Sequence, residues 1–315
     1  MKIGLDIMGG DFAPETTVAG ALLTLKELPS DVKLFFIGKE EVIKSTLNKK
    51  KVDLSASSFE IVNATEMVEM GESPTKAISQ KRDSSMAVGF RMLSNKEIDG
   101  FASTGNSGAM LVSAMRSVGA VPGIYRPCIT TPFPKQNGSV TILLDVGVNA
   151  DCKPDVLYQF AILGSIYASA VYNIENPRVG LLNIGEEEKK GNLLTHATYE
   201  MMKGTNDFNF VGNVEGSDLL SEDIDVIVCD GFTGNVVLKE AEAFYAAIKK
   251  RGISDEYFDK FNYENYGGTP LLGINAPIIM GHGRSNDIAV KNMILLTKGV
   301  IEAQLTDKIK EALRK

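Results

Sequence analysis

Short apolar runs alternate with helix-length amphipathic stretches along the whole of this sequence. The runs predict strands at residues 3–7, 33–37, 59–62, 100–103, 140–145, 179–183, 209–211 and 225–229. Helices are predicted between them at residues 14–27, 84–94, 107–118, 154–172, 191–203, 234–251 and 286–313. Several strand runs are apolar on both faces, as buried parallel strands are. The alternation therefore predicts an α/β fold with three α/β/α layers and a mostly parallel sheet.

No Pro/Gly/Ser-rich linker interrupts this alternation. We therefore expect residues 1–315 to form a single α/β unit, or two lobes that share one sheet. The longest apolar stretch covers residues 156–172 and is shorter than the ~20 residues of a membrane-spanning helix, so it predicts a buried or interface helix. The sequence opens at once on a strand-like run, and we expect no signal peptide.

Charge and cysteine content exclude several functional classes. The chain has 33 Lys and Arg against 40 Asp and Glu, and this acidic balance argues against broad nucleic-acid binding. Its three cysteines are widely spaced and fit neither a zinc pattern nor a disulfide framework. A reducing, cytoplasmic location is the simplest interpretation.

Polar turns follow five of the predicted strands. Gly, Asn, Ser and Asp gather at residues 8–11, 103–108, 145–149, 183–187 and 230–235. Such residues are common in turns for structural reasons alone. Ligands of open α/β sheets bind at the carboxyl ends of the strands, however, so five such turns on one sheet edge predict a single binding crevice.

The turns favour an anion as ligand. Thr-Gly-Asn occurs at residues 104–106 and 233–235, each time between a predicted strand and a predicted helix, where free backbone N–H groups bind anions. Motifs for nucleoside triphosphates, dinucleotides, serine hydrolases and zinc proteases are absent from the sequence. Of the two histidines, His282 lies between glycines after a strand-like run and is the functional candidate, whereas His196 fits a helix surface. Lys190 precedes a helix as part of a charged run.

Taken together and in order, these motifs resemble the bacterial phosphate acyltransferase PlsX family. The matching pieces lie at residues 6–11, 83–86, 103–109, 126–127, 144–149, 181–187, 190–192, 212–216, 230–236, 238–239, 266–268 and 282–283. Each piece is weak alone, but together they span nearly the whole chain.

The resemblance implies a fold similar to isocitrate and isopropylmalate dehydrogenases and to phosphotransacetylases. It implies an acyltransferase that converts fatty acyl-ACP and inorganic phosphate to acyl phosphate and free acyl carrier protein (ACP). It further implies a homodimer, with no nicotinamide cofactor and no obligatory metal. Phosphate is itself a nucleophile, so such a site needs an anion-binding surface, alignment and oxyanion donors rather than a Ser-His-Asp or Cys-His set.

Functional residues are proposed on the matching positions. The candidate catalytic residues are Lys190, His282, Asp230 and Asp145. Lys190, with the turns at residues 103–107 and 231–235, is expected to hold phosphate or the oxyanion, and His282 to donate to the oxyanion or protonate the thiolate. The two aspartates are expected to orient these donors and Asn149, and to help deprotonate monoanionic phosphate. The candidate substrate-binding residues are Gly9, Gly10, Asp11, Ser103, Gly105, Asn106, Ser107, Asn149, Asn183, Glu186, Asn213, Glu215, Gly231, Thr233 and Asn235.

One segment departs from the family pattern. Residues 240–266 are shorter than the corresponding stretch of the family, which carries an apolar helical tip linked to membrane docking. Here the segment ends with five aromatic residues in residues 257–266. Weak peripheral membrane contact, dimer contact and acyl-chain lining all remain open for it.

Three other functions fit parts of the pattern. A short-chain phosphotransacetylase would use acyl-CoA in place of acyl-ACP. A dehydrogenase of the isocitrate type would share the fold but need a nicotinamide site and a metal. A non-catalytic scaffold would bind acyl-ACP without releasing thiol.

Overall fold

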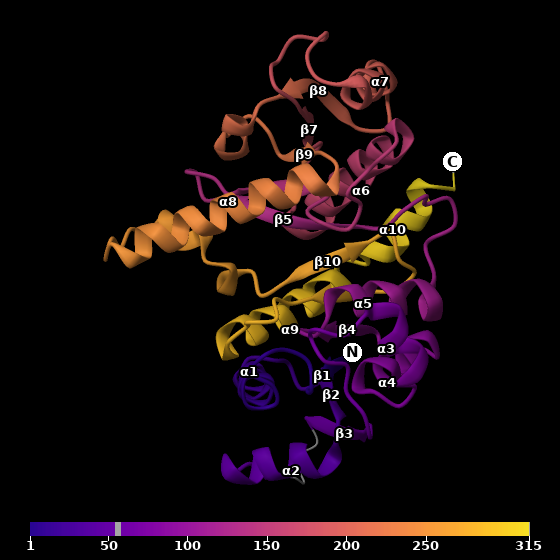
Figure 1. The fold of residues 1–315 in the computed structure, drawn as a ribbon, viewed down its shortest axis with the longest axis vertical. Coiled ribbons are helices and arrows are strands. Elements are labelled where there is room, and N and C mark those ends of the chain that lie inside the picture. Colours follow the sequence, from indigo (N-terminus) through magenta and orange to yellow (C-terminus); the bar gives the residue numbers. More distant parts are fainter. Residues whose placement is uncertain (54–57, 315) are drawn as a thin grey trace. The chain divides into compact units, whose positions relative to one another are not determined.

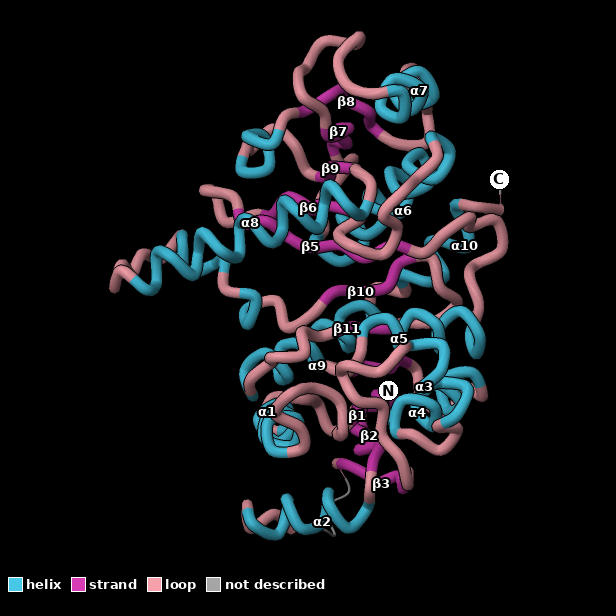
Figure 2. The backbone as a smooth tube through the Cα atoms, viewed as in Figure 1, coloured by secondary structure: helices cyan, strands magenta, loops and turns pink. Residues whose placement is uncertain are grey.

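Two sets of strands, each with its own helices, organise the chain (Figures 1 and 2). This computed structural model describes residues 1–53 and 58–314. Unit 1 comprises Met1–Gly119, Tyr263–Pro270 and Ile274–Glu302, and unit 2 comprises Ala120–Asn262, Leu271–Gly273 and Ala303–Lys315. The strand β10 (Thr269–Leu272) contributes its first half to unit 1 and its second half to unit 2.

Unit 1 has the strand order β3-β2-β1-β4-β11-β10. All neighbouring pairs are parallel except β10 with β11. Its strands are β1 (Lys2–Asp6), β2 (Lys33–Gly38), β3 (Phe59–Asn63), β4 (Gly100–Ser103) and β11 (Ile278–Met280), besides the start of β10. Its helices are α1 (Glu15–Leu25), α2 (Glu40–Lys49), α3 (Pro74–Gln80), α4 (Ser85–Ser94), α5 (Ser107–Ser113) with the π-helix Ala114–Val118, the short η4 (Tyr263–Asn265) and α9 (Asp287–Glu302).

Helices cover both faces of the unit 1 sheet. A Cβ added to Gly100 of β4 would meet Thr297 of α9, whereas the ring of the next residue, Phe101, lies against Gly89 of α4. Successive strand residues point to opposite faces, so α9 and α4 lie on opposite sides of the sheet. The unit therefore has the predicted α/β/α layers.

Unit 2 has the strand order β10-β5-β6-β9-β7-β8, in which β5 is antiparallel to both neighbours. Its strands are β5 (Cys128–Pro134), β6 (Val140–Leu144), β7 (Arg178–Leu182), β8 (Asn209–Val214) and β9 (Val226–Val228), besides the end of β10. Its helices are α6 (Pro154–Tyr172), α7 (Leu193–Met202), α8 (Gly231–Lys250), α10 (Leu305–Ala312) and the short η2 (Gly216–Leu220) and η3 (Phe258–Phe261).

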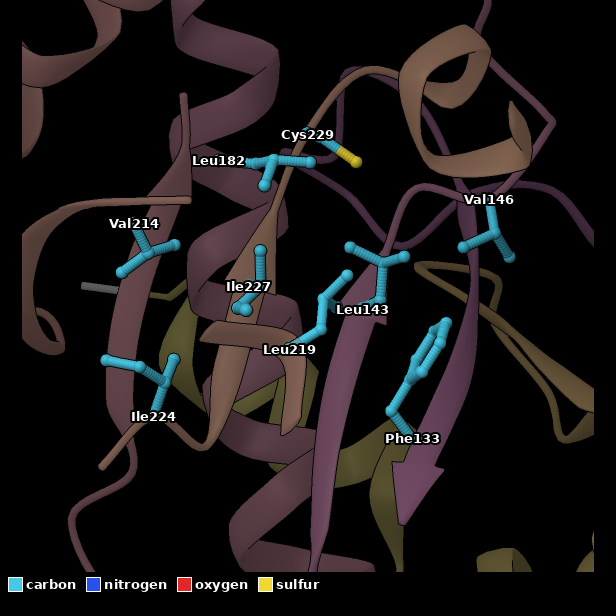
Figure 3. Packing of buried hydrophobic residues seen from close by; sticks show 9 residues of the cluster. All are labelled: Phe133, Leu143, Val146, Leu182, Val214, Leu219, Ile224, Ile227 and Cys229. Carbon is cyan, nitrogen blue, oxygen red and sulfur yellow. The ribbon is translucent and has the colours of Figure 1, made fainter. Parts of the chain in front are cut away.

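The unit 2 sheet is also covered on both faces. Leu144 of β6 lies against Gly164 of α6. Its neighbour Leu143 points the other way, into a cluster against which Leu238 and Ala241 of α8 pack. Figure 3 shows Leu143 in this cluster with Phe133, Val146, Leu182, Val214, Leu219, Ile224, Ile227 and Cys229. The cluster fixes α8 over the sheet and so sets where its N-terminus lies.

Several predicted elements need correction. The helix predicted at 234–251 begins at Gly231. The helix predicted at 286–313 is two helices, because Gln304 has a left-handed backbone with φ of 52°. The strand predicted at 209–211 continues to Val214. The sequence prediction also missed β5, β10, α2 and α3. In the described residues, no helix is both long and apolar enough to cross a bilayer.

Candidate active site

The carboxylate of Asp6, at the end of β1, is a buried anchor in unit 1. Asp6 is 2% exposed and accepts hydrogen bonds from Ser103 Oγ at 2.7 Å and from the Met8 backbone N–H at 3.1 Å. Burial raises the pKa of Asp6. Hydrogen bonds from Ser85 and Ser103 act in the opposite direction but do not outweigh the burial. Asp6 was not among the site residues predicted from the sequence. A carboxylate at the end of an otherwise apolar strand is the sequence signal that could have identified it.

The glycine loop after β1 packs against the turn after β4. A Cβ added to Gly9 would lie 2.8 Å from the Gly105 nitrogen, so only glycine allows this approach. Thr104 Oγ1 donates to the Gly9 carbonyl at 2.8 Å, and the Asp11 N–H donates to the Gly283 carbonyl at 2.8 Å. These contacts bring together five predicted site residues, Gly9, Gly10, Asp11, Ser103 and Gly105.

Asn106 joins the start of α5 to the loop at residues 69–72. Its side-chain oxygen accepts from the Ala109 N–H at 3.0 Å and caps the helix. Its amide nitrogen donates to the carbonyls of Glu69 at 3.3 Å, Met70 at 3.0 Å and Glu72 at 3.0 Å. The structure therefore uses the predicted ligand Asn106 as an organiser of two loops, while its exposed neighbour Ser107 begins the helix.

Replacing Asn106 by aspartate is expected to release the 69–72 loop and to keep the helix cap. A carboxylate still accepts from Ala109, but it faces three carbonyl oxygens without a donor. Hydrogen–deuterium exchange of residues 66–73 should rise at least tenfold. The control is Asn286→Asp, because Asn286 accepts from Ala289 in the same way at the start of α9. Equal exchange in the two variants would contradict this role.

His282 is exposed directly after β11. Its Nδ1 accepts the Arg284 backbone N–H at 3.2 Å, and its ring centroid lies 5.2 Å from that of Tyr263. An Nδ1 that accepts a hydrogen bond places the proton of the neutral imidazole on Nε2. This tautomer suits the predicted donor role of His282.

In unit 2, Asp145 is a fully buried carboxylate that shapes the turn after β6. It accepts from the Asn149 backbone N–H at 2.7 Å and from Asn149 Nδ2 at 2.8 Å. The N–H groups of Ile129 and Val148 donate to its other oxygen at 3.2 and 3.3 Å. Asp145 thus holds Asn149 in place, and its contacts are those of a positioning group.

Asp230 caps α8 and accepts both the backbone N–H and the hydroxyl of Thr233, at 2.9 and 2.8 Å. The predicted Thr-Gly-Asn turn at 233–235 is consequently the first turn of the helix. Gly234 is required there, because an added Cβ would lie 1.9 Å from the Asp145 carbonyl oxygen. Asn235 donates from Nδ2 to the Val146 carbonyl at 3.2 Å. The Gly231 N–H donates to the Asn149 carbonyl at 2.7 Å.

Lys190 lies in the loop between β7 and α7. Asn183 Nδ2 donates to the Lys190 carbonyl at 3.0 Å and thereby fixes the loop backbone. The Lys190 side chain is 48% exposed, and its Nζ lies 3.9 Å from a Glu187 carboxylate oxygen. Asn213 Nδ2 donates to the Glu187 carbonyl at 3.0 Å. The loop therefore presents an ammonium group on a backbone that other residues hold.

Burial keeps the three thiols of unit 2 protonated. Cys128, Cys152 and Cys229 are free cysteines. Burial, followed by the charge of Asp145, raises the pKa of Cys152 to about 12. The pKa values of Cys128 and Cys229 are raised above their ordinary value by the same burial. A thiolate nucleophile is therefore disfavoured at neutral pH.

The predicted residues thus fall into two groups. Unit 1 brings together the glycine loop, the turn at 103–107 and the loop after β11. Unit 2 brings together the turn at 145–149, the start of α8 and the loop at 183–192. Glu186 and Glu215 are exposed, and Glu215 caps η2. That all the turns form a single crevice stays a prediction.

A comparison with protein-family models matches residues 1–308 to the family described as "Fatty acid synthesis protein". The chain belongs to this family.

Within the described residues, no group of three His, Cys, Asp or Glu side chains is placed to hold a metal ion.

Relatives in this fatty acid synthesis family are similar over their full length. A phosphate acyltransferase of Dictyoglomus turgidum is 40% identical over 343 aligned positions, which cover 100% of this chain and 98% of the relative. A phosphate acyltransferase of Syntrophomonas wolfei is 43% identical over 314 positions, which cover 96% and 97% of the two chains.

Solved structures support the predicted fold of this family member. A phosphotransacetylase of Streptococcus pyogenes matches with a TM-score of 0.66 at 17% identity, covering 95% of this chain and 94% of that one. The EutD phosphotransacetylase of Staphylococcus aureus matches with a TM-score of 0.63 at 16% identity, covering 97% and 94%. The predicted phosphotransacetylase-like α/β/α fold is therefore confirmed.

Proposed function

We propose that this protein is a phosphate acyltransferase that converts fatty acyl-ACP and inorganic phosphate to acyl phosphate and free ACP. The observation that carries the proposal is the full-length similarity to phosphate acyltransferases at about 40% identity. The site supports it chemically, because backbone N–H groups, amides and an exposed lysine suit a phosphate, and the nearby thiols stay protonated. No covalent enzyme intermediate is needed.

The reaction is a direct displacement at the thioester. An oxygen of the hydrogen phosphate dianion forms a bond to the carbonyl carbon, and the C–S bond breaks with its electron pair going to sulfur. The hydroxyl proton of phosphate ends on the departing thiolate. Lys190 is assigned to holding the phosphate or the oxyanion, and His282, with its proton on Nε2, to donating a hydrogen bond to the oxyanion that forms on the thioester. Asp145 and Asp230 act as positioning residues for Asn149 and Thr233.

The test is phosphate-dependent thiol release from palmitoyl-ACP, with the acyl product trapped by hydroxylamine. Release that requires phosphate, with a hydroxamate product, supports the proposal. Acetyl-CoA is assayed alongside to show which thioester carrier the enzyme uses. A preference for acetyl-CoA would mean that the substrate is an acyl-CoA and not an acyl-ACP. A folded protein that releases thiol from neither carrier would overturn the enzymatic proposal. Homodimerisation and weak membrane contact are further parts of the proposal, which sedimentation analysis and vesicle flotation test directly.

A further inference from the structure

A pocket of about 310 Å³ lies in unit 2 at the carboxyl ends of β7 and β9. It is formed by these two strands, α6 and the starts of α7 and α8. Its apolar lining comprises Leu157, Leu181, Leu182, Ile184 and Cys229.

The polar side chains around this pocket form hydrogen bonds within its walls. Asn192 accepts the Thr195 N–H at 3.0 Å, and Thr195 Oγ1 accepts the Asn192 N–H at 3.0 Å. Asp230 accepts the Thr233 hydroxyl at 2.8 Å, and Asn183 donates to the Lys190 carbonyl at 3.0 Å. Their main hydrogen-bonding capacity is thus used in holding the walls, which leaves an apolar ligand as the best fit.

The rest of the wall is hydrocarbon and sulfur. Leu157, Leu181, Leu182 and Cys229 are buried residues, and Leu182 and Cys229 lie at one end of the cluster in Figure 3. The Cys229 thiol is neutral, since burial raises its pKa. By contrast, Ile184 is 78% exposed although it lines the pocket, so it places an apolar side chain at the mouth.

The loop at residues 183–192, which lines part of the pocket, also carries the cationic side chain of Lys190. Lys190 lies between Asn183 and Gly191, both of which line the pocket, in a segment closed by the hydrogen bond from Asn183 to the Lys190 carbonyl. The stem of Lys190 runs over Gly185, where an added Cβ would lie 3.0 Å from Lys190 Cγ. The same loop therefore carries a cationic side chain and lines an apolar pocket. A ligand with an anionic head group and an apolar tail requires both features.

We propose that this pocket binds the first methylenes of the acyl group, next to the reacting carbonyl, while the loop of Lys190 holds the phosphate. This assignment rests on the proposed function and names the part of the substrate that unit 2 recognises. The volume is at the lower end of the roughly 300–1,000 Å³ of small-molecule sites. The pocket thus takes the proximal part of a long chain, and the remainder lies outside it.

The decisive variant is Ile184→Trp, which narrows the mouth at an exposed position and so spares the fold. Its control is Leu193→Trp, because Leu193 is 91% exposed at the start of α7 and lies outside the pocket lining. For the wild type, kcat/KM should rise with acyl length from two carbons, about fourfold for each methylene buried, until the pocket is full. Ile184→Trp should lower kcat/KM for hexanoyl-ACP at least tenfold and reach its plateau at a shorter chain. Leu193→Trp should follow the wild type.

Binding of n-alkyl phosphonates, measured by calorimetry, separates this inference from the proposed function. Affinity should increase from methyl to hexyl phosphonate in the wild type and in Leu193→Trp, but not in Ile184→Trp. Thiol release with the same length profile in all three proteins would overturn the pocket assignment and leave the function intact. Absence of thiol release with length-dependent phosphonate binding would overturn the function and leave the pocket. Length-independent binding in all three proteins would again overturn the pocket assignment.

Discussion

Replacing Lys190 by alanine is expected to lower turnover at least a hundredfold while the protein stays folded. Phosphate carries two negative charges near neutral pH, and a further charge develops on the thioester oxygen as the new bond forms. One well-placed donor to such a charge contributes about 3–4 kcal/mol, which corresponds to a loss of roughly a hundredfold to a thousandfold in rate. Lys190 supplies an exposed ammonium in the loop that follows β7.

The loop geometry makes this effect separable from folding. Asn183 binds the backbone carbonyl of Lys190, and Gly191, with φ of 101°, turns the chain toward α7. Neither contact uses the lysine side chain. The ion pair of Lys190 with Glu187 is exposed and spans 3.9 Å, so its contribution to stability is small. The unfolding midpoint of the variant should therefore match that of the wild type.

The matched control is Lys189→Ala, which removes an equally charged, exposed neighbour in the same loop. Steady-state turnover of palmitoyl-ACP at varied phosphate concentration distinguishes the two variants. We expect Lys189→Ala to stay within threefold of the wild type. A folded Lys190→Ala protein with near-normal turnover would show that the phosphate is held by other groups.

The starts of α5 and α7 were predicted to within two residues because local chemistry marks them. Asn106 and Asn192 cap helices with their own side chains, and such capping residues are recognisable without any tertiary contact. The start of α8 was missed for the opposite reason. Gly231 and Gly234 weaken helix propensity, yet α8 contains both, because a buried approach to the turn of Asp145 excludes a Cβ at Gly234.

The strands that the sequence prediction missed owe their pairing to distant partners. Pro132 and Pro134 of β5 and Pro270 of β10 cannot donate to a ladder, and proline argues against a strand in a single sequence. Here β5 pairs antiparallel with β6 and β10 all the same. The apolar pocket was missed because leucines such as Leu157 and Leu181 look like ordinary core residues. Only the fold shows that they surround a hollow.

Removal of the Asp225 carboxylate is expected to destabilise the protein by about 3–5 kcal/mol, because it leaves a buried charge without its partner. Lys135 is 1% exposed, and its Nζ donates to Asp225 Oδ1 at 2.9 Å. The other carboxylate oxygen accepts from the backbone N–H and Nε of Arg178, at 2.9 and 3.0 Å. Asp225→Ala would thus leave the ammonium of Lys135 buried in unit 2 without this carboxylate.

Urea unfolding of Asp225→Ala measures this cost, and Asp223→Ala provides the matched control. Asp223 also pairs with Arg178, at 3.5 Å, but its side chain is 89% exposed, so its removal should change stability by less than about 1 kcal/mol. The double variant Lys135→Met/Asp225→Ala should recover part of the loss, because it buries no unpaired ammonium. Equal stability of Asp225→Ala and Asp223→Ala would contradict the buried-pair interpretation.

The same carboxylate predicts how stability depends on pH. Burial alone would raise the pKa of Asp225, but the hydrogen bonds from Arg178 and Lys135 outweigh it and lower the pKa from 3.8 to about 2. The folded state therefore binds the proton more weakly than the unfolded state. The resulting contribution, roughly 2 kcal/mol, is fully present above pH ~4 and is lost as the pH falls through about 2. The difference in free energy of unfolding between wild type and Asp225→Ala should therefore become smaller as the pH falls from ~4 to about 2. A difference that stays constant over this interval would show that the charge of Asp225 is not the source of the stabilisation.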